Sequence, residues 1–162
     1  MAEPVLNDTT LGTLLGALAA RAGTVPKYRY PSAGTLYPVQ AYVMLRAGTD
    51  AIAAGSYYYD PQGHELVALS PQVPQAPDGS TPPMLLMLAA QRSAIEPIYG
   101  TETEPFSLLE AGYMTEALRG EADGLSLRDA GDPSANAGLI EACRLEATHQ
   151  PLVCLAIGEK AQ

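Results

Sequence analysis

Residues 27 to 45 read KYRYPSAGTLYPVQAYVML, and the stretch changes character in its middle. Its first twelve residues hold three tyrosines and two prolines around the triplet Ser32-Ala33-Gly34. From Val39 to Leu45 the residues are apolar at nearly every position, whichever side of a strand they would face. This pattern is typical of a strand that is covered on both faces. The stretch therefore predicts a stiff loop of small residues that leads directly into a buried strand.

The residues on either side of this stretch predict a helix and a hairpin. Leucines at helical spacing indicate a helix that is capped by Thr9 or Thr10 and ends near Gly23. The segment GSYYYDPQGHELVAL predicts a β-hairpin whose turn covers residues 60–63. The apolar run at 84–91 is too short to distinguish a strand from a helix by its period.

The second half of the chain alternates helical and strand patterns. A helix is expected over 106–122, with an apolar face made of Leu108, Leu109, Gly112, Met114 and Leu118. A weaker helix is expected over 135–144 and a buried strand over 151–157, whereas residues 71–83 hold five prolines and predict a loop. Strands separated by helices indicate an α+β fold with a central mixed sheet flanked by helices. At 162 residues, 1–162 is expected to form a single domain.

The composition excludes several classes of function. The formal net charge is −9 and the nine lysines and arginines are scattered, which argues against binding a nucleic-acid backbone. The apolar runs are too short to span a membrane, and the N-terminus has no signal-peptide pattern. Two cysteines without a C-x-x-C pair indicate a cytoplasmic location, and two isolated histidines indicate no metal site.

The common catalytic motifs, such as G-x-S-x-G and the phosphate-binding G-x-x-x-x-G-K-[ST], do not occur in this sequence. The loop PSAG, residues 31–34, is the alternative place for chemistry, because its small residues let backbone amides approach a flat, polar-edged ring such as a flavin. Neighbouring tyrosines could stack on such a ring. The other interpretation is a tight turn whose tyrosines fill the core.

The chain resembles the oxidase domains of nonribosomal peptide synthetases in four segments that occur in the family's order: KYRYPSAGTLYPVQAYV, GSYYYDPQGHELVAL, AIEPIYG and FSLLEAGYMTEAL with GLSL after it. HQPLVCLAIGE is similar to the family's closing strand, so the resemblance covers about residues 11–158. These FMN-dependent domains belong to the nitroreductase-like superfamily and are close to the SagB-type dehydrogenases. The resemblance implies a homodimer or pseudo-dimer with FMN in a groove at the interface.

The resemblance also implies a reaction and its partners. A thiazoline or oxazoline, tethered to a peptidyl carrier protein of a synthetase module, would be oxidised to the aromatic azole. Pro31, Ser32, Ala33 and Gly34 would line the flavin ring, with Leu36 nearby. The cofactor would carry the redox step, while the protein positions the reactants.

Three residues before the loop are the candidates for proton transfer. A buried Lys27 could act as the base, since burial favours the neutral amine. Alternatively Tyr28 could act with Lys27 beside it, and Tyr30 ranks second. The competing interpretation of Lys27 is a surface cation. Glu110 is expected to be buried and hydrogen-bonded, while Tyr99 and Tyr113 could line the pocket or pack in the core.

The flavin phosphate is the weak point of the resemblance. The superfamily usually begins with an arginine-rich helix that holds this phosphate, whereas the first arginine here is Arg21. Substitutes would be Arg29 and Arg46, the pair Gly124 and Ser126, and Lys160.

Three accounts of the missing helix stay open: a piece truncated at its N-terminus, a compact domain that holds FMN with other groups, or a domain that has lost FMN. The third account would make the chain a non-catalytic scaffold or carrier-docking module. A general flavin-dependent nitroreductase is a further alternative.

Overall fold

A computed structural model describes residues 6–25 and 27–161, and its centre is a six-stranded sheet with the order β3-β2-β1-β4-β6-β5. The strands are β1 (Val39–Leu45), β2 (Gly55–Asp60), β3 (Glu65–Ser70), β4 (Met84–Gln91), β5 (Leu125–Asp129) and β6 (His149–Glu159). Every neighbouring pair is antiparallel, so the expected mixed sheet is wrong. Strands β4 and β5, which the long helix connects along the chain, run in the same direction. However, β6 lies between them and is antiparallel to both.

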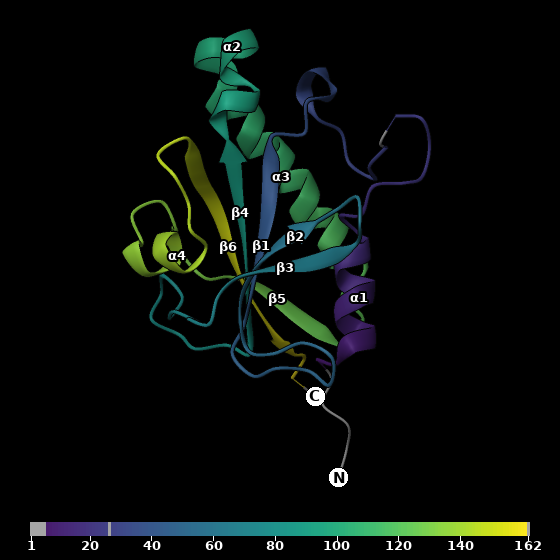
Figure 1. Cartoon of the computed structure of the whole chain (residues 1–162), viewed down its shortest axis with the longest axis vertical. Helices are drawn as coiled ribbons and strands as arrows, with labels where there is room; N and C mark the ends of the chain where they lie inside the picture. The colour runs from purple at the N-terminus through teal and green to yellow at the C-terminus, as the bar shows by residue number, and fades with distance from the viewer. Residues whose placement is uncertain (1–5, 26, 162) are drawn as a thin grey trace.

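Helices cover both faces of this sheet. They are α1 (Asp8–Gly16), α2 (Glu96–Tyr99), α3 (Thr103–Gly120) and α4 (Ala137–Ala142), with short 3-10 turns at Ala33–Thr35, Arg92–Ala94 and Gly100–Glu102. Figure 1 shows α1 and α3 on one side of the sheet and α4 on the other. One core cluster accordingly joins α1 and α3 to the sheet, and a second joins α4 and part of the 71–83 loop to the opposite face.

Strand β1 has the predicted bounds, and six of its seven residues are buried. The hairpin of β2 and β3 and the strand β6 also form where the sequence predicts them. The ambiguous run at 84–91 is the strand β4, which is buried at seven of its eight positions because it lies between β1 and β6. Strand β5 was not expected, and of its residues only Ser126 was named before, together with Gly124, as a candidate for the flavin phosphate.

Helix α1 is shorter than expected. Asn7, not Thr9 or Thr10, is the N-cap, and Thr10 completes a capping box with it. The helix ends at Gly16, seven residues before the predicted end at Gly23. The predicted apolar face is nevertheless correct, because Leu11, Leu14, Leu15 and Leu18 are all buried.

Helix α3 faces the sheet with only part of the predicted side: Met114 and Leu118 are buried as predicted, whereas Leu108 and Leu109 are not. Its buried stripe includes Ser107, Glu110, Ala111, Met114 and Leu118. Leu108 and Leu109 were expected in the core but are 46% and 56% exposed. The cause is the angle of 100° between successive helix residues, which places 108 and 109 on the outer side once 107, 110 and 111 face the sheet.

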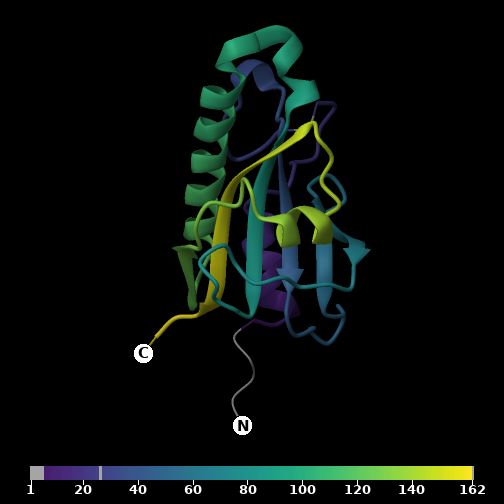
Figure 2. The same ribbon diagram turned by 90° about the vertical axis from the view of Figure 1, so that its left-hand side faces the viewer.

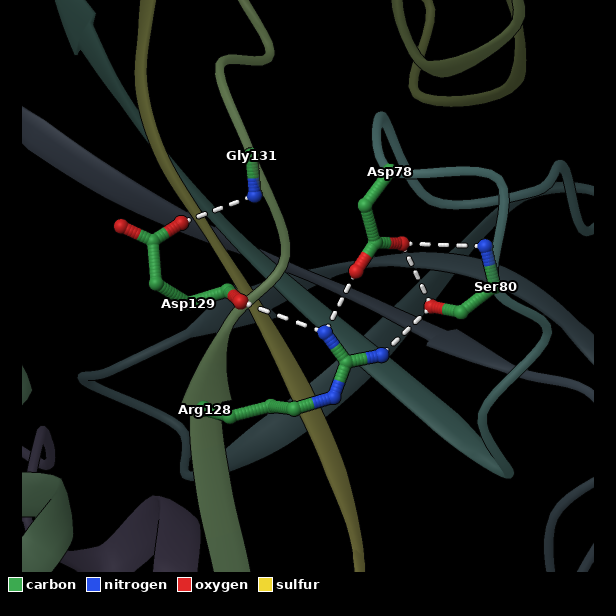
Figure 3. A network of polar contacts seen from close by, with 5 residues as sticks. All are labelled: Asp78, Ser80, Arg128, Asp129 and Gly131. Atoms are coloured by element: carbon green, nitrogen blue, oxygen red, sulfur yellow. Dashed lines mark hydrogen bonds and ion pairs between the residues drawn. The ribbon is translucent and has the colours of Figure 1, made fainter.

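The proline-rich loop 71–83 is held to the sheet by two arginines. The guanidinium of Arg46 donates to the backbone carbonyls of Val73, Pro74 and Pro82. The guanidinium of Arg128, on β5, donates to the Asp78 carboxylate and to the Ser80 hydroxyl (Figure 3). Among the described residues, no helix is both long and apolar enough to cross a membrane.

Candidate functional site

The loop from Pro31 to Tyr37 lies at the end of the sheet where α2 is found (Figures 1 and 2). Three of its residues have a positive φ: Gly34 (59°), Thr35 (57°) and Tyr37 (48°). Such a conformation is ordinary for glycine but strained for a β-branched threonine and for tyrosine. Strained backbone of this kind is concentrated at functional sites. The sequence contains no pattern from which the strain at Thr35 and Tyr37 could be found.

Gly34 has a specific steric role in the loop. A Cβ atom at this position would lie 2.7 Å from the hydroxyl of Tyr99, which belongs to α2. The ring of Tyr99 packs edge-on against Phe106 of α3, with 5.0 Å between centroids. Gly34 therefore lets the loop approach the α2–α3 segment closely.

Glu110 joins the loop to the start of β1. Its side chain is 2% exposed, and its Oε2 accepts a hydrogen bond of 2.8 Å from the backbone N–H of Val39. Burial raises the pKa of this carboxyl to about 7, although hydrogen bonds from the Ser32 hydroxyl and from the Val39 amide act in the opposite direction. The buried, hydrogen-bonded carboxylate expected from the sequence is thus present.

The loop separates two hollows in the surface. On one side, a hollow of about 240 Å³ lies between Pro31, Ser32 and Ala33 and the α3 residues Phe106, Leu109, Glu110 and Tyr113. On the other side, a hollow of about 350 Å³ is lined by loop residues Thr35 to Tyr37, by Tyr28, Tyr30 and Tyr58, and by the β2–β3 turn from Asp60 to Gln62. The turn residues were not expected at a site, since they are distant from the loop in sequence.

Three tyrosines from this region form one cluster. The ring centroids of Tyr28 and Tyr37 are 4.1 Å apart, and Tyr30 lies 5.5 Å from Tyr28 and 5.6 Å from Tyr37. Burial, and then neighbouring tyrosine and carboxylate groups, raise the pKa values of Tyr28 and Tyr30 above their ordinary range. Both hydroxyls therefore keep their protons near neutral pH and can act as hydrogen-bond donors.

The two basic residues before the loop lie outside the hollow against α3. Lys27 is exposed, and its carbonyl accepts a hydrogen bond from the N–H of Arg21. A catalytic Lys27 would have to be buried, and in the single chain it is not. Arg29 forms an exposed ion pair of 2.8 Å with Glu121, at the far end of α3.

The remaining phosphate candidates form a second group. The N–H of Lys160 donates to the carbonyl of Gly124, and the hydroxyl of Ser126 contacts the Gly158 and Glu159 carbonyls, where β5 pairs with β6. The loop lies beside Glu110, and Arg29 lies beside Glu121. These two glutamates are eleven residues apart along α3, which is roughly 16 Å at 1.5 Å per residue. Figures 1 and 2 likewise show β5 at the end of the molecule opposite to α2. The predicted cofactor residues are therefore two separate groups.

The smaller hollow, between the loop and α3, is called the hollow against α3 below. It is compatible with a flavin ring but offers no cation for the flavin phosphate. The lining combines small loop residues with aromatic and aliphatic side chains, which suits a flat ring. None of its lining residues is a lysine or arginine. No group of three or more metal-ligating side chains was found in the part of the chain that the structure describes.

The chain is similar to part of a curated protein, the indigoidine synthase of Dickeya dadantii. The two are 37% identical over 104 residues, which is 64% of this chain but 7% of the length of that synthase. No family model matches the chain.

Solved structures show the same fold. A candidate nitroreductase from Ralstonia eutropha superposes with a TM-score of 0.79 at 24% identity, covering 100% of this chain and 77% of the other. A chain of the E. coli microcin synthetase McbBCD complex, solved with truncated pro-MccB17 bound, superposes with a TM-score of 0.82 at 21% identity, covering 99% of this chain and 66% of the other. The expected α+β fold of nitroreductase type is thereby confirmed.

Proposed function

We propose that this chain, an α+β domain of nitroreductase-like fold, is an FMN-dependent oxidoreductase that oxidises a carrier-tethered thiazoline or oxazoline to the azole. The observation that carries the proposal is the strained loop from Pro31 to Tyr37, which has a ring-sized hollow on one side and a tyrosine-lined hollow on the other. The two hollows offer adjacent places for a cofactor and for a substrate.

The cofactor proposal rests on the fold and on the shape of the hollow against α3. Proteins of this fold typically bind FMN. When bound, the flavin would supply the two-electron acceptor. Pro31, Ser32 and Ala33 would contact one edge of the ring, and Phe106 and Tyr113 would cover its apolar part. Gly34 and Leu36 would act by shaping the loop.

A second subunit would complete this site. Leu109 and Tyr113 line the hollow and are also exposed on the outer side of α3, at 56% and 49%. Two copies, or a related domain in the same synthetase, would close the hollow if they met through this face. The partner could then supply the cation for the phosphate, either from Arg29 or from the group at Gly124, Ser126 and Lys160.

The tyrosines and the lysine would act on the substrate. Tyr28 and Tyr30 keep their protons, so they would orient an azoline by donating hydrogen bonds. Lys27 would accept the ring proton only where a docked carrier protein or peptide covers its amine. The azoline substrate is proposed on the resemblance to peptide-synthetase oxidases, and the microcin synthetase neighbour, solved with truncated pro-MccB17 bound, supports it.

The first test is an absorbance spectrum of the purified protein, followed by titration with FMN. Near-stoichiometric flavin is expected, together with turnover of a carrier-bound azoline. Lys27→Ala should abolish turnover without releasing flavin. The matched control is Arg144→Ala, because Arg144 is an exposed cation that follows α4 on the other face of the sheet. Turnover that survives Lys27→Ala would refute the role of Lys27.

The second candidate function is a non-catalytic scaffold or carrier-docking module. It is favoured by the ion pair that engages Arg29 and by the lack of a cation among the residues that line the hollow against α3. A protein that stays colourless in excess FMN and still binds a carrier protein would establish this function instead. Reduction of free nitroaromatics by NAD(P)H, with no activity on a tethered substrate, would indicate a general nitroreductase.

A further inference from the structure

The carboxyl group of Glu110 is connected to both ends of the loop that carries the proposed site. Its Oε2 accepts from the N–H of Val39, the first residue of β1. The Ser32 hydroxyl also interacts with this carboxyl, and Ser32 Oγ accepts a hydrogen bond of 2.8 Å from the N–H of Tyr37. One buried side chain on α3 thus binds the amide of Val39 just after the loop, and it lines the same hollow as Ser32 near the start of the loop.

The second oxygen of this carboxyl is left without a partner. Among the described residues, Glu110 Oε1 makes no hydrogen bond, and neither does Ser107 Oγ, one turn earlier on the same buried stripe. A buried oxygen without a donor destabilises the ionised form. The hydrogen bond from the Val39 amide to Oε2 stabilises the same form, so the two ionisation states lie close in free energy. The pKa of about 7 agrees with this balance.

The groups that face Glu110 do not themselves change charge near neutral pH. Tyr28 and Tyr30 lie close enough to interact with it electrostatically, and the pKa values of both are raised, so they stay neutral. The described part of the chain forms no ion pair with Glu110: its salt bridges involve Arg29, Arg92 and Arg128. The facing residues of β1, Val39 and Ala41, are not titratable.

We propose that Glu110 is the positioning residue of the 31–37 loop, and that its ionisation controls how firmly the junction of this loop with β1 is attached to α3. A hydrogen bond to a carboxylate is stronger than one to a neutral carboxyl group. The loop is therefore held more firmly when Glu110 is ionised, and is loosened as the pH falls through neutrality. If the loop binds FMN, as the proposed function states, FMN should bind more tightly at higher pH.

The test follows the backbone amide signals of Val39 and Tyr37 by NMR, in the protein without added flavin, between about pH 5 and about pH 9. In the wild type, the two signals are expected to shift together with a midpoint near 7. In Glu110→Gln this shift should be absent, since the amide can still accept from Val39 but does not ionise. The control is Glu116→Gln, on the exposed side of the same helix, which should retain the shift.

Two outcomes would overturn the proposal: wild-type amides that do not titrate, or a shift that persists in Glu110→Gln and so comes from another group. If Glu110→Gln fails to fold, Ser32→Ala replaces it. Removing that hydroxyl takes away a hydrogen bond that lowers the pKa of Glu110, so the midpoint should move to higher pH. An unchanged midpoint in Ser32→Ala would contradict the proposed connection.

A second measurement separates this proposal from the proposed function. The dissociation constant for FMN at pH 8 should be roughly fivefold lower than at pH 6. This ratio corresponds to the difference in strength between a charge-assisted and a neutral hydrogen bond. In Glu110→Gln the two constants should be equal. If the amides titrate and FMN binds at neither pH, the positioning role of Glu110 stands and the flavin proposal fails.

Discussion

The conformation of the loop at Gly34 requires a residue without a Cβ atom. Its φ of 59° disfavours any residue with a Cβ, and a Cβ would lie 2.7 Å from the Tyr99 hydroxyl. Gly34→Ala is therefore expected to lower the free energy of unfolding by about 1–2 kcal/mol. Urea denaturation followed by circular dichroism measures this difference.

The control for this substitution is Gly112→Ala in the middle of α3. Nothing lies within 4 Å of a Cβ at Gly112, so alanine should be neutral or stabilising there. Adding Tyr99→Phe to Gly34→Ala removes the clashing hydroxyl and should recover part of the lost stability. Equal stability of Gly34→Ala and the wild type would show that the loop does not need this glycine.

Single residues also show which site predictions depended on tertiary contacts. Lys27 and Arg29 are adjacent to the loop in sequence, but in the folded chain Lys27 is exposed and Arg29 pairs with Glu121. Glu110 could be expected to be buried from its apolar neighbours, but its bond to Val39 joins positions 71 residues apart. The sequence contains no local pattern for such a pairing.

At the scale of elements, the 71–83 loop is attached to β5 by a polar network (Figure 3). Hydrogen bonds from the Ser80 hydroxyl and amide, and then the Arg128 guanidinium, lower the pKa of Asp78 to about 2. A carboxyl whose pKa is lowered on folding stabilises the fold above its ordinary value of 3.8, and this stabilisation is lost as the pH falls towards 2. The attachment of the loop should therefore weaken in acid.

Asp78→Asn tests this pH dependence. At pH 6 the variant should have a lower Tm than the wild type, and the difference should disappear as the pH falls from about 4 to about 2. Asp123→Asn is the control, because Asp123 is exposed in the connection between α3 and β5. Scanning calorimetry measures both. A difference in Tm that is the same at every pH would contradict the electrostatic explanation.

Elements with a strong local pattern were predicted well, and those without one were not. The sequence determines β1 through its apolar run and the β2–β3 hairpin through a turn with Asp, Pro and Gly. The short strand β5 has no such alternation and forms by pairing with β6. Helix α1 ends at Gly16, the earlier of two glycines that follow its leucines, whereas the prediction placed the end at Gly23.

At the scale of the whole molecule, the outer side of α3 exposes an apolar face made of Leu108, Leu109 and Tyr113. If this face joins two copies, the wild type should sediment as a dimer. Leu109→Glu should shift it to the monomer, since the substitution would place two like charges in a desolvated interface. Analytical ultracentrifugation at several concentrations measures the change.

The matched control is Val67→Glu, which changes another exposed apolar residue, on β3 at the edge of the sheet. This variant should remain dimeric. A second readout is FMN binding, which should be lost with the dimer if the partner completes the phosphate site. A wild type that stays monomeric at all concentrations would show that this face does not bind a second copy.

The sequence alone determined the α+β class, the loop of small residues before a buried strand, and the likeness to flavin-dependent peptide oxidases, because each depends on patterns within short segments. Only the tertiary structure decided that the sheet is wholly antiparallel and that Leu108 and Leu109 lie on the surface. It also decided that the predicted cofactor residues form two groups at different ends of α3. These features depend on which segments, distant in sequence, pack against one another. That packing is determined by the free energy of the whole core.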